Sequence, residues 1–90
     1  MNELLVSLEE AKEYLRVDGD GEDKLISSLL HMAEDCVSDI LRYDLTAELM
    51  EEPIHQAILI LVVHFYEERS GENIPQVVYE LLRPYRKAEW

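Results

Sequence analysis

The sequence predicts an all-α protein, a small bundle of about four helices. Apolar residues recur at helical spacing in four segments, and a proline, a glycine or a capping residue marks an end of most of these segments. The β-branched run near residues 57–63 has no second strand to pair with. A chain of 90 residues is expected to form one domain, residues 1–90.

The first helix is expected at about residues 7–17. The stretch "SLEE" is a capping box, in which the Ser7 hydroxyl accepts from the Glu10 amide and the Glu10 carboxylate reaches back. Apolar residues follow at helical spacing: Leu8, Ala11, Tyr14 and Leu15.

The second helix, at about 22–42, has the clearest pattern, because one half of its helical wheel is apolar and the other half is polar. The apolar half holds Leu25, Ile26, Leu29, Leu30, Met32, Ala33, Cys36, Val37, Ile40 and Leu41. The polar half holds Ser27, Ser28, His31, Glu34, Asp35, Ser38, Asp39 and Arg42.

A connector at 43–52, with room for one helical turn, precedes a third helix at about 53–69. Pro53 suits a first helical turn and Gly71 suits the end. This helix is apolar on most sides, so it is expected to be central or shared with a neighbouring chain. One face holds Ile54, Ala57, Ile58, Leu61, Val62 and Phe65, and a second holds Leu59, Ile60, Val63 and Tyr66.

The last helix is expected at about 75–83, opened by Pro75 and kinked or ended by Pro84. The tail "YRKAEW" after it is expected to be mobile. The inward side chains are Val77, Val78, Leu81 and Leu82.

The stretch "VDGDGED" (17–23) resembles the start of a calcium loop but is better interpreted as a hinge. An EF-type loop needs a glutamate at its twelfth position, which is Leu29 when counted from Asp18 and His31 when counted from Asp20. The glycines allow a turn, and Asp20 or Asp23 is suited to cap the second helix.

No other motif indicates catalysis, a cofactor or a metal centre. His64 and Glu68, four residues apart, could share a metal, but they lack a third ligand. The serines lack a nucleophile context, and Cys36 is expected to face the core. We therefore expect neither an enzyme nor a bound cofactor; a metal-dependent enzyme using His64 and Glu68 is an alternative.

The charge is strongly acidic and uneven, with 20 acidic against 8 basic residues and a net charge of −12. Fifteen of the acids lie in residues 1–52, whereas bases cluster near the C-terminus. Such a chain is not expected to grip DNA phosphates. A single cysteine excludes an intrachain disulfide, the start "MNELLVSLEE" lacks signal-peptide features, and the longest apolar run is too short to span a membrane.

The order of these features resembles the small head–tail connector proteins of tailed bacteriophages and prophages, long labelled putative DNA-packaging proteins. The resemblance covers nearly the whole chain, and "HFYEER" (64–69) is one of its most specific parts. The other is the C-terminal pattern of Ile74, Pro75, Val78, Leu81, Leu82, Pro84, Tyr85 and Arg86.

The resemblance implies a structural subunit without catalysis or cofactor. About a dozen copies would form a ring on the portal protein at the virion head–tail joint, after assembly in the host bacterial cytoplasm. The ring would extend the DNA channel, let DNA pass without specific binding, and meet a downstream head-completion or tail protein. No membrane partner is implied.

An interface with a copy or another protein is expected where apolar or basic side chains exceed the needs of a lone bundle. The candidates are Leu59, Ile60, Val63, Tyr66, Arg83, Tyr85, Arg86 and Lys87. An alternative function is a small prophage regulator that binds another protein as a monomer or dimer.

Overall fold

Four α-helices and two short 3-10 turns make up this computed structural model, which describes residues 5–68 and 73–86. The elements are α1 (Leu8–Leu15), α2 (Asp23–Leu41), η1 (Ala47–Leu49), α3 (Glu52–Glu68), α4 (Gln76–Leu82) and η2 (Arg83–Tyr85). The described part of the chain contains no strand. The all-α prediction is confirmed, and each predicted helix lies within two residues of the observed bounds.

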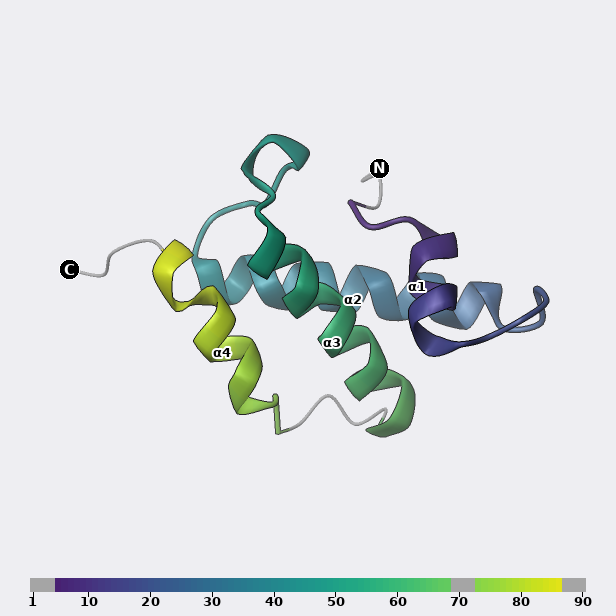
Figure 1. The fold of residues 1–90 in the computed structure, drawn as a ribbon. Helices are drawn as coiled ribbons and strands as arrows, with labels where there is room; N and C mark the ends of the chain where they lie inside the picture. The colour runs from purple at the N-terminus through teal and green to yellow at the C-terminus, as the bar shows by residue number, and fades with distance from the viewer. Residues whose placement is uncertain (1–4, 69–72, 87–90) are drawn as a thin grey trace.

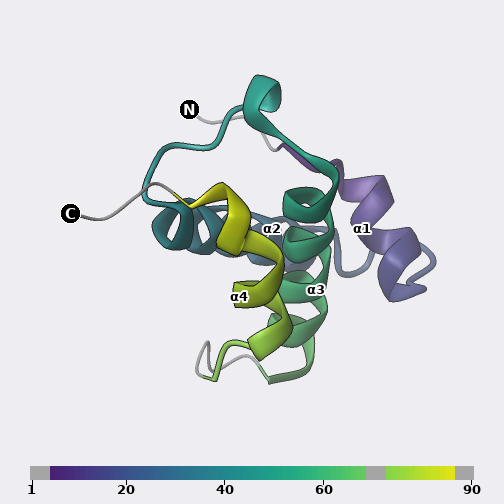
Figure 2. The same ribbon diagram turned by 60° about the vertical axis from the view of Figure 1, so that its left-hand side comes forward.

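The long helix α2 forms the base on which the other helices pack (Figures 1 and 2). In both views α2 lies behind α3 and α4, while α1 lies on the other side of α3 from α4. The α2–α3 pair forms the most extensive contact between elements. The connector carrying η1 projects from the body near the start of α3.

The core lies between α2, α3 and α4, with one contribution from α1 and one from the segment before it. Its apolar members are Val6, Ala11, Ile26, Leu29, Leu30, Ala33, Val37, Leu41, Ile54, Ala57, Ile58, Leu59, Leu61, Val62, Phe65, Val78 and Leu82. The apolar stripe of α2 and the central face of α3 therefore pack as the periodicity predicts.

Local chemistry explains where α1 begins and ends. The Glu10 amide donates to the Ser7 hydroxyl, as predicted for the N-cap. The helix ends where Arg16 adopts the left-handed conformation and the amides of Arg16 and Val17 donate to carbonyls of the last turn. This is a Schellman motif, formed here by arginine rather than glycine.

The start of α2 differs from the expectation. Its N-cap is Glu22, with no side-chain cap bond, so neither Asp20 nor Asp23 caps the helix. Asp23 instead pairs with Lys12 of α1 at 2.7 Å. Gly19 has a φ of +80°, a conformation that favours glycine, and so it supplies the turn that joins α1 to α2.

The end of the chain is more ordered than predicted as far as Arg86. Pro84 interrupts the α-helical pattern, and η2 continues α4 as a 3-10 turn. The Tyr43 hydroxyl donates to the Tyr85 carbonyl at 3.1 Å, which fixes this turn against the segment that follows α2. Gly71 and the tail from Lys87 onward lie outside the described residues.

Candidate assembly interface

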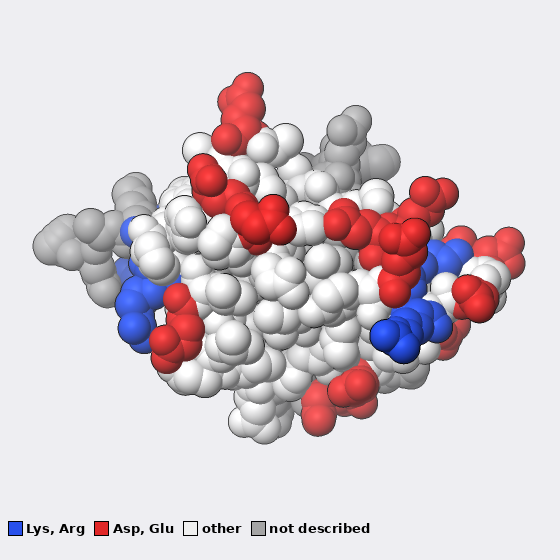
Figure 3. Space-filling view, viewed as in Figure 1, with Lys and Arg blue, Asp and Glu red and all other residues white. Residues whose placement is uncertain are grey.

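An uncharged surface covers the outer side of α3 and the adjoining side of α4 (Figure 3). On α3, Ile60 and Val63 are half-buried, and Ile60 packs against the edge of the core. On α4, Val77 is 47% exposed and Leu81, one turn later, is half-buried. We call the surface of these four residues the α3–α4 face. Carboxylates lie around it, so an apolar centre has a charged rim.

Only part of the predicted second face of α3 is available to a partner. Leu59 is just 5% exposed and belongs to the core, because the side of α3 that carries it is covered within the chain. Tyr66 is half-buried, and its hydroxyl donates to the Glu22 carboxylate at 2.6 Å. That bond ties the end of α3 to the start of α2.

The prediction for α4 also needs a correction. Val77 was expected to face inward, yet it is exposed, whereas Val78 and Leu82 are buried. Val77 follows the helix's apolar pattern, but within residues 5–68 and 73–86 nothing buries its side chain. It therefore adds to the α3–α4 face an apolar side chain that helical periodicity had assigned to the core.

The basic residues near the C-terminus lie on the surface. Arg83 and Arg86 are both exposed. The Arg83 guanidinium is 3.8 Å from the Glu80 carboxylate one turn earlier, a solvent-exposed pair of small energetic value. Tyr85 is half-buried beside them. Lys87 falls outside the described residues.

On α2, Met32 is another residue that the sequence analysis placed wrongly. It was assigned to the apolar half of the helix, yet it is 43% exposed. Its neighbours on the same stripe are Ser28, Asp35 and Asp39, all exposed and spaced by three or four residues. That spacing was visible in the sequence and marks Met32 as an apolar residue within a polar stripe.

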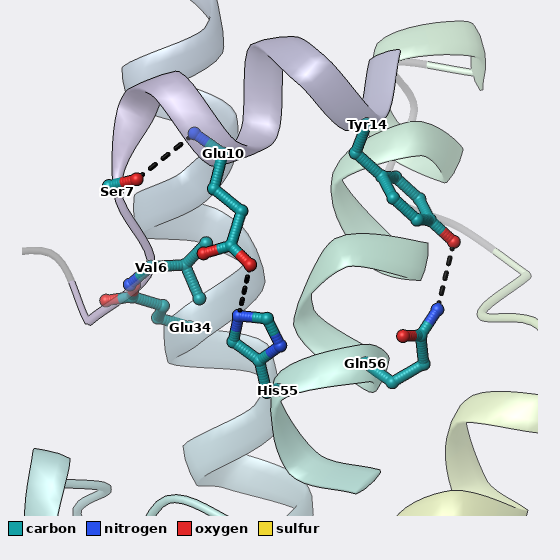
Figure 4. Close-up of polar contacts among 7 residues, drawn as sticks. All are labelled: Val6, Ser7, Glu10, Tyr14, Glu34, His55 and Gln56. Atoms are coloured by element: carbon teal, nitrogen blue, oxygen red, sulfur yellow. Dashed lines mark hydrogen bonds and ion pairs between the residues drawn. The ribbon is translucent and has the colours of Figure 1, made fainter. Parts of the chain in front are cut away.

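Glu34 was assigned to the polar surface of α2, but it is buried. Its Oε2 atom accepts from the backbone amides of Leu5 at 2.7 Å and Val6 at 3.0 Å. Figure 4 shows Glu34 next to Val6. Val6 is itself buried to 1% exposure. The carboxylate thus holds the segment before α1 against α2.

Polar contacts also fasten α1 to α3. The Glu10 carboxylate, predicted to reach back to the helix start, instead contacts the His55 Nε2 atom at 2.9 Å (Figure 4). The Gln56 amide donates to the Tyr14 hydroxyl at 3.1 Å. These two contacts hold α1 against α3.

The described residues were compared with the arrangement that a metal centre needs. Within 5–68 and 73–86 there is no group of three or more potential metal ligands. An open depression at the end of α1 mixes acidic and basic side chains and is lined by Glu9, Lys12, Glu13, Arg16, Val17, Asp18 and Gly19.

Burial, and secondly the nearby Asp39 carboxylate, raises the pKa of the Cys36 thiol.

A family model described as "Phage gp6-like head-tail connector protein" matches residues 5–86. That span includes the four helices of the described residues and the α3–α4 face. The chain belongs to this family of phage head–tail connectors. Neither the curated proteins nor the solved structures gave a significant match.

Membership of the connector family supports a structural role in the virion and contacts with other phage head or tail proteins. The exposed apolar and basic residues of this connector are therefore candidates for those contacts. Among the described helices, none is long and apolar enough to cross a membrane.

Proposed function

We propose that this connector is the subunit of a closed ring of about a dozen copies at the portal vertex. The ring extends the DNA channel and joins the head to the next head-completion or tail protein. The observation that supports this proposal most strongly is the connector-family match over residues 5–86. Assembly takes place in the host bacterial cytoplasm, before the virion is complete.

The α3–α4 face is the surface that this proposal assigns to contacts between protein chains. Ile60, Val63, Val77 and Leu81 give it an uncharged centre in a protein with a net charge of −12. Apolar surface at the centre of a contact, with charge at the rim, is the usual arrangement of a protein interface. Arg83 and Arg86 are exposed and supply positive charge after α4, and Lys87 follows them in the sequence.

The acidic composition suits a channel through which DNA moves. Binding to DNA is driven largely by lysine and arginine side chains that neutralise phosphates. This chain carries 20 acidic residues against 8 basic ones, so a wall built from it attracts DNA weakly. The ring accordingly acts as a conduit and an adaptor, and it performs no chemistry on the DNA.

The proposal is tested by co-sedimentation of the labelled connector with phage heads. Heads that carry the portal should bind many copies per vertex, with saturation near one ring, whereas heads assembled without the portal should bind none. Equal binding to both kinds of head, or binding to neither, would contradict a role at the portal vertex.

A further inference from the structure

A closed ring of identical subunits needs two different contact surfaces on each copy, one for each neighbour. In a ring of about a dozen copies, each copy is turned by only about 30° relative to the next, so the two surfaces lie on nearly opposite sides of the subunit. If the α3–α4 face is one of these surfaces, its complement lies on the far side of the molecule.

The helix on the far side is α2, which lies behind α3 and α4 in both views (Figures 1 and 2). Its outward stripe carries one large apolar side chain, that of Met32, which is 43% exposed. The stripe also carries the exposed carboxylates of Asp35 and Asp39 toward the C-terminal end of the helix. An apolar centre beside acidic groups is thus present opposite the α3–α4 face.

At one end of the molecule, the charges of the two surfaces are complementary when neighbouring copies share one orientation. The segments that follow α2 and α4 meet at one end of the molecule, where the Tyr43 hydroxyl donates to the Tyr85 carbonyl. Arg83 and Arg86 lie at that end beside the α3–α4 face, and Asp39 lies toward the same end of α2. Stacking one copy behind the next therefore brings bases of one copy toward acids of its neighbour.

The shape of the subunit favours the same direction of stacking. Its principal dimensions are 45 × 27 × 22 Å. For a given number of copies, the diameter of a ring grows with the spacing between neighbours. Stacking across a short dimension gives a ring about half as wide as stacking end to end along the long dimension, which suits a narrow DNA channel.

We propose that the α2 stripe of one copy docks on the α3–α4 face of the next. Met32 packs among the apolar side chains of that face, and Asp35 and Asp39 lie opposite Arg83 and Arg86. This inference rests on the proposed ring and specifies the two surfaces that build it.

The first test uses exposed positions, so that each variant can fold. Met32→Asp and Val77→Asp each place a carboxylate at the centre of one proposed surface. Leu49→Asp is the matched control, since Leu49 is 46% exposed on η1 and belongs to neither surface. Each variant is checked by circular dichroism and then added to portal-bearing heads, whose vertices are imaged by electron microscopy.

The wild type and Leu49→Asp should form rings, and the other two variants should form at least about tenfold fewer at the same concentration. If the wild type forms no ring, the proposed function fails as well. If it forms rings and Met32→Asp does so equally well, only this assignment of surfaces is overturned. Loss of rings with Val77→Asp but not Met32→Asp would mean that the α3–α4 face binds a different protein.

The second test reverses charges. Changing Arg83 and Arg86 to Glu, or Asp35 and Asp39 to Lys, should each reduce the number of rings, and the reduction should lessen in high salt. Combining all four changes in one chain should restore ring formation, because the opposed charges are then exchanged. A combined variant no better than the two separate ones would overturn the proposed pairing.

Discussion

Glu34 places a carboxylate inside the molecule, where it bonds two backbone amides that precede α1. Buried donors that lose their acceptor are costly, and hydrogen bonds to a charged group are stronger than neutral ones. Glu34→Ala should therefore lower the free energy of unfolding by about 2–4 kcal/mol. Glu34→Gln should cost less, because the amide oxygen still accepts.

Asp35→Ala is the control for this prediction, since Asp35 is exposed on the same helix. It should change stability by no more than about 0.5 kcal/mol. Urea unfolding of the three variants measures the difference. An equal loss for Glu34→Ala and Asp35→Ala would show that the carboxylate contributes little to holding the segment before α1.

Cys36 is expected to react slowly with alkylating reagents in the folded protein. The thiolate is the reactive form, and a raised pKa lowers its fraction at neutral pH. The rate of iodoacetamide modification at pH 7–8 should be lower than that of the urea-unfolded chain and should rise as the pH increases. A folded protein that reacts at least as fast as the unfolded chain would contradict this.

The same raised pKa has a consequence for stability. The folded state favours the protonated thiol, so this contribution is fully present below the pKa of the unfolded chain and is lost as the pH rises toward the folded pKa. Without the thiol, the Cys36→Ala variant should lose less of its free energy of unfolding than the wild type when the pH is raised.

At the scale of elements, α3 is the helix on which the bundle depends. Ile58 has no exposed surface and lies at the centre of the face packed against α2. Ile58→Ala should cost about 2–5 kcal/mol, since it removes buried methyl groups and leaves a cavity. Ile60 lies two residues later, on nearly the opposite side of the helix, and is half-buried. Ile60→Ala should therefore lower the free energy of unfolding clearly less than Ile58→Ala.

Thermal or urea unfolding compares the two alanine variants. A loss below about 1 kcal/mol for Ile58→Ala would mean that this position is not part of a tightly packed core. Equal losses at the two positions would mean that the outer side of α3 is as well packed as the inner side.

The positions of the elements follow from signals that are local in the sequence. The cap at Ser7, the proline at the start of α3 and the apolar repeat of α2 act within a few residues, so the helix bounds could be predicted closely. Whether an apolar side chain at the edge of a stripe is covered depends instead on neighbouring helices. Periodicity therefore placed Met32 and Val77 inside and Leu59 outside, and the structure shows the reverse.

The burial of Glu34 was not predictable for a related reason. Its partners, Leu5 and Val6, are 28–29 residues away in the sequence and approach only when the segment before α1 packs on α2. Exposure agrees with only some of the residues predicted for an interface, which itself stays a prediction. Ile60, Val63, Arg83 and Arg86 lie where a partner can reach them, whereas the contribution of Met32 needed the three-dimensional arrangement.

At the scale of the whole molecule, the net charge of −12 leads to a prediction about DNA. Repulsion between carboxylates and phosphates should prevent tight binding, even at low salt, where electrostatic effects are strongest. An electrophoretic shift assay with duplex DNA should show no complex at micromolar protein. A stable complex at physiological salt would contradict the role of a passive conduit.

The proposed role of this connector depends on its assembly into a ring on the portal. The most direct measurement is electron cryomicroscopy of portal-bearing heads after addition of the purified connector. We expect a closed ring of helical density below the portal, in which α2 of each subunit faces α3 and α4 of the next and a short dimension of the subunit follows the circumference. A vertex with no added density, or with a single copy bound beside the portal, would contradict it.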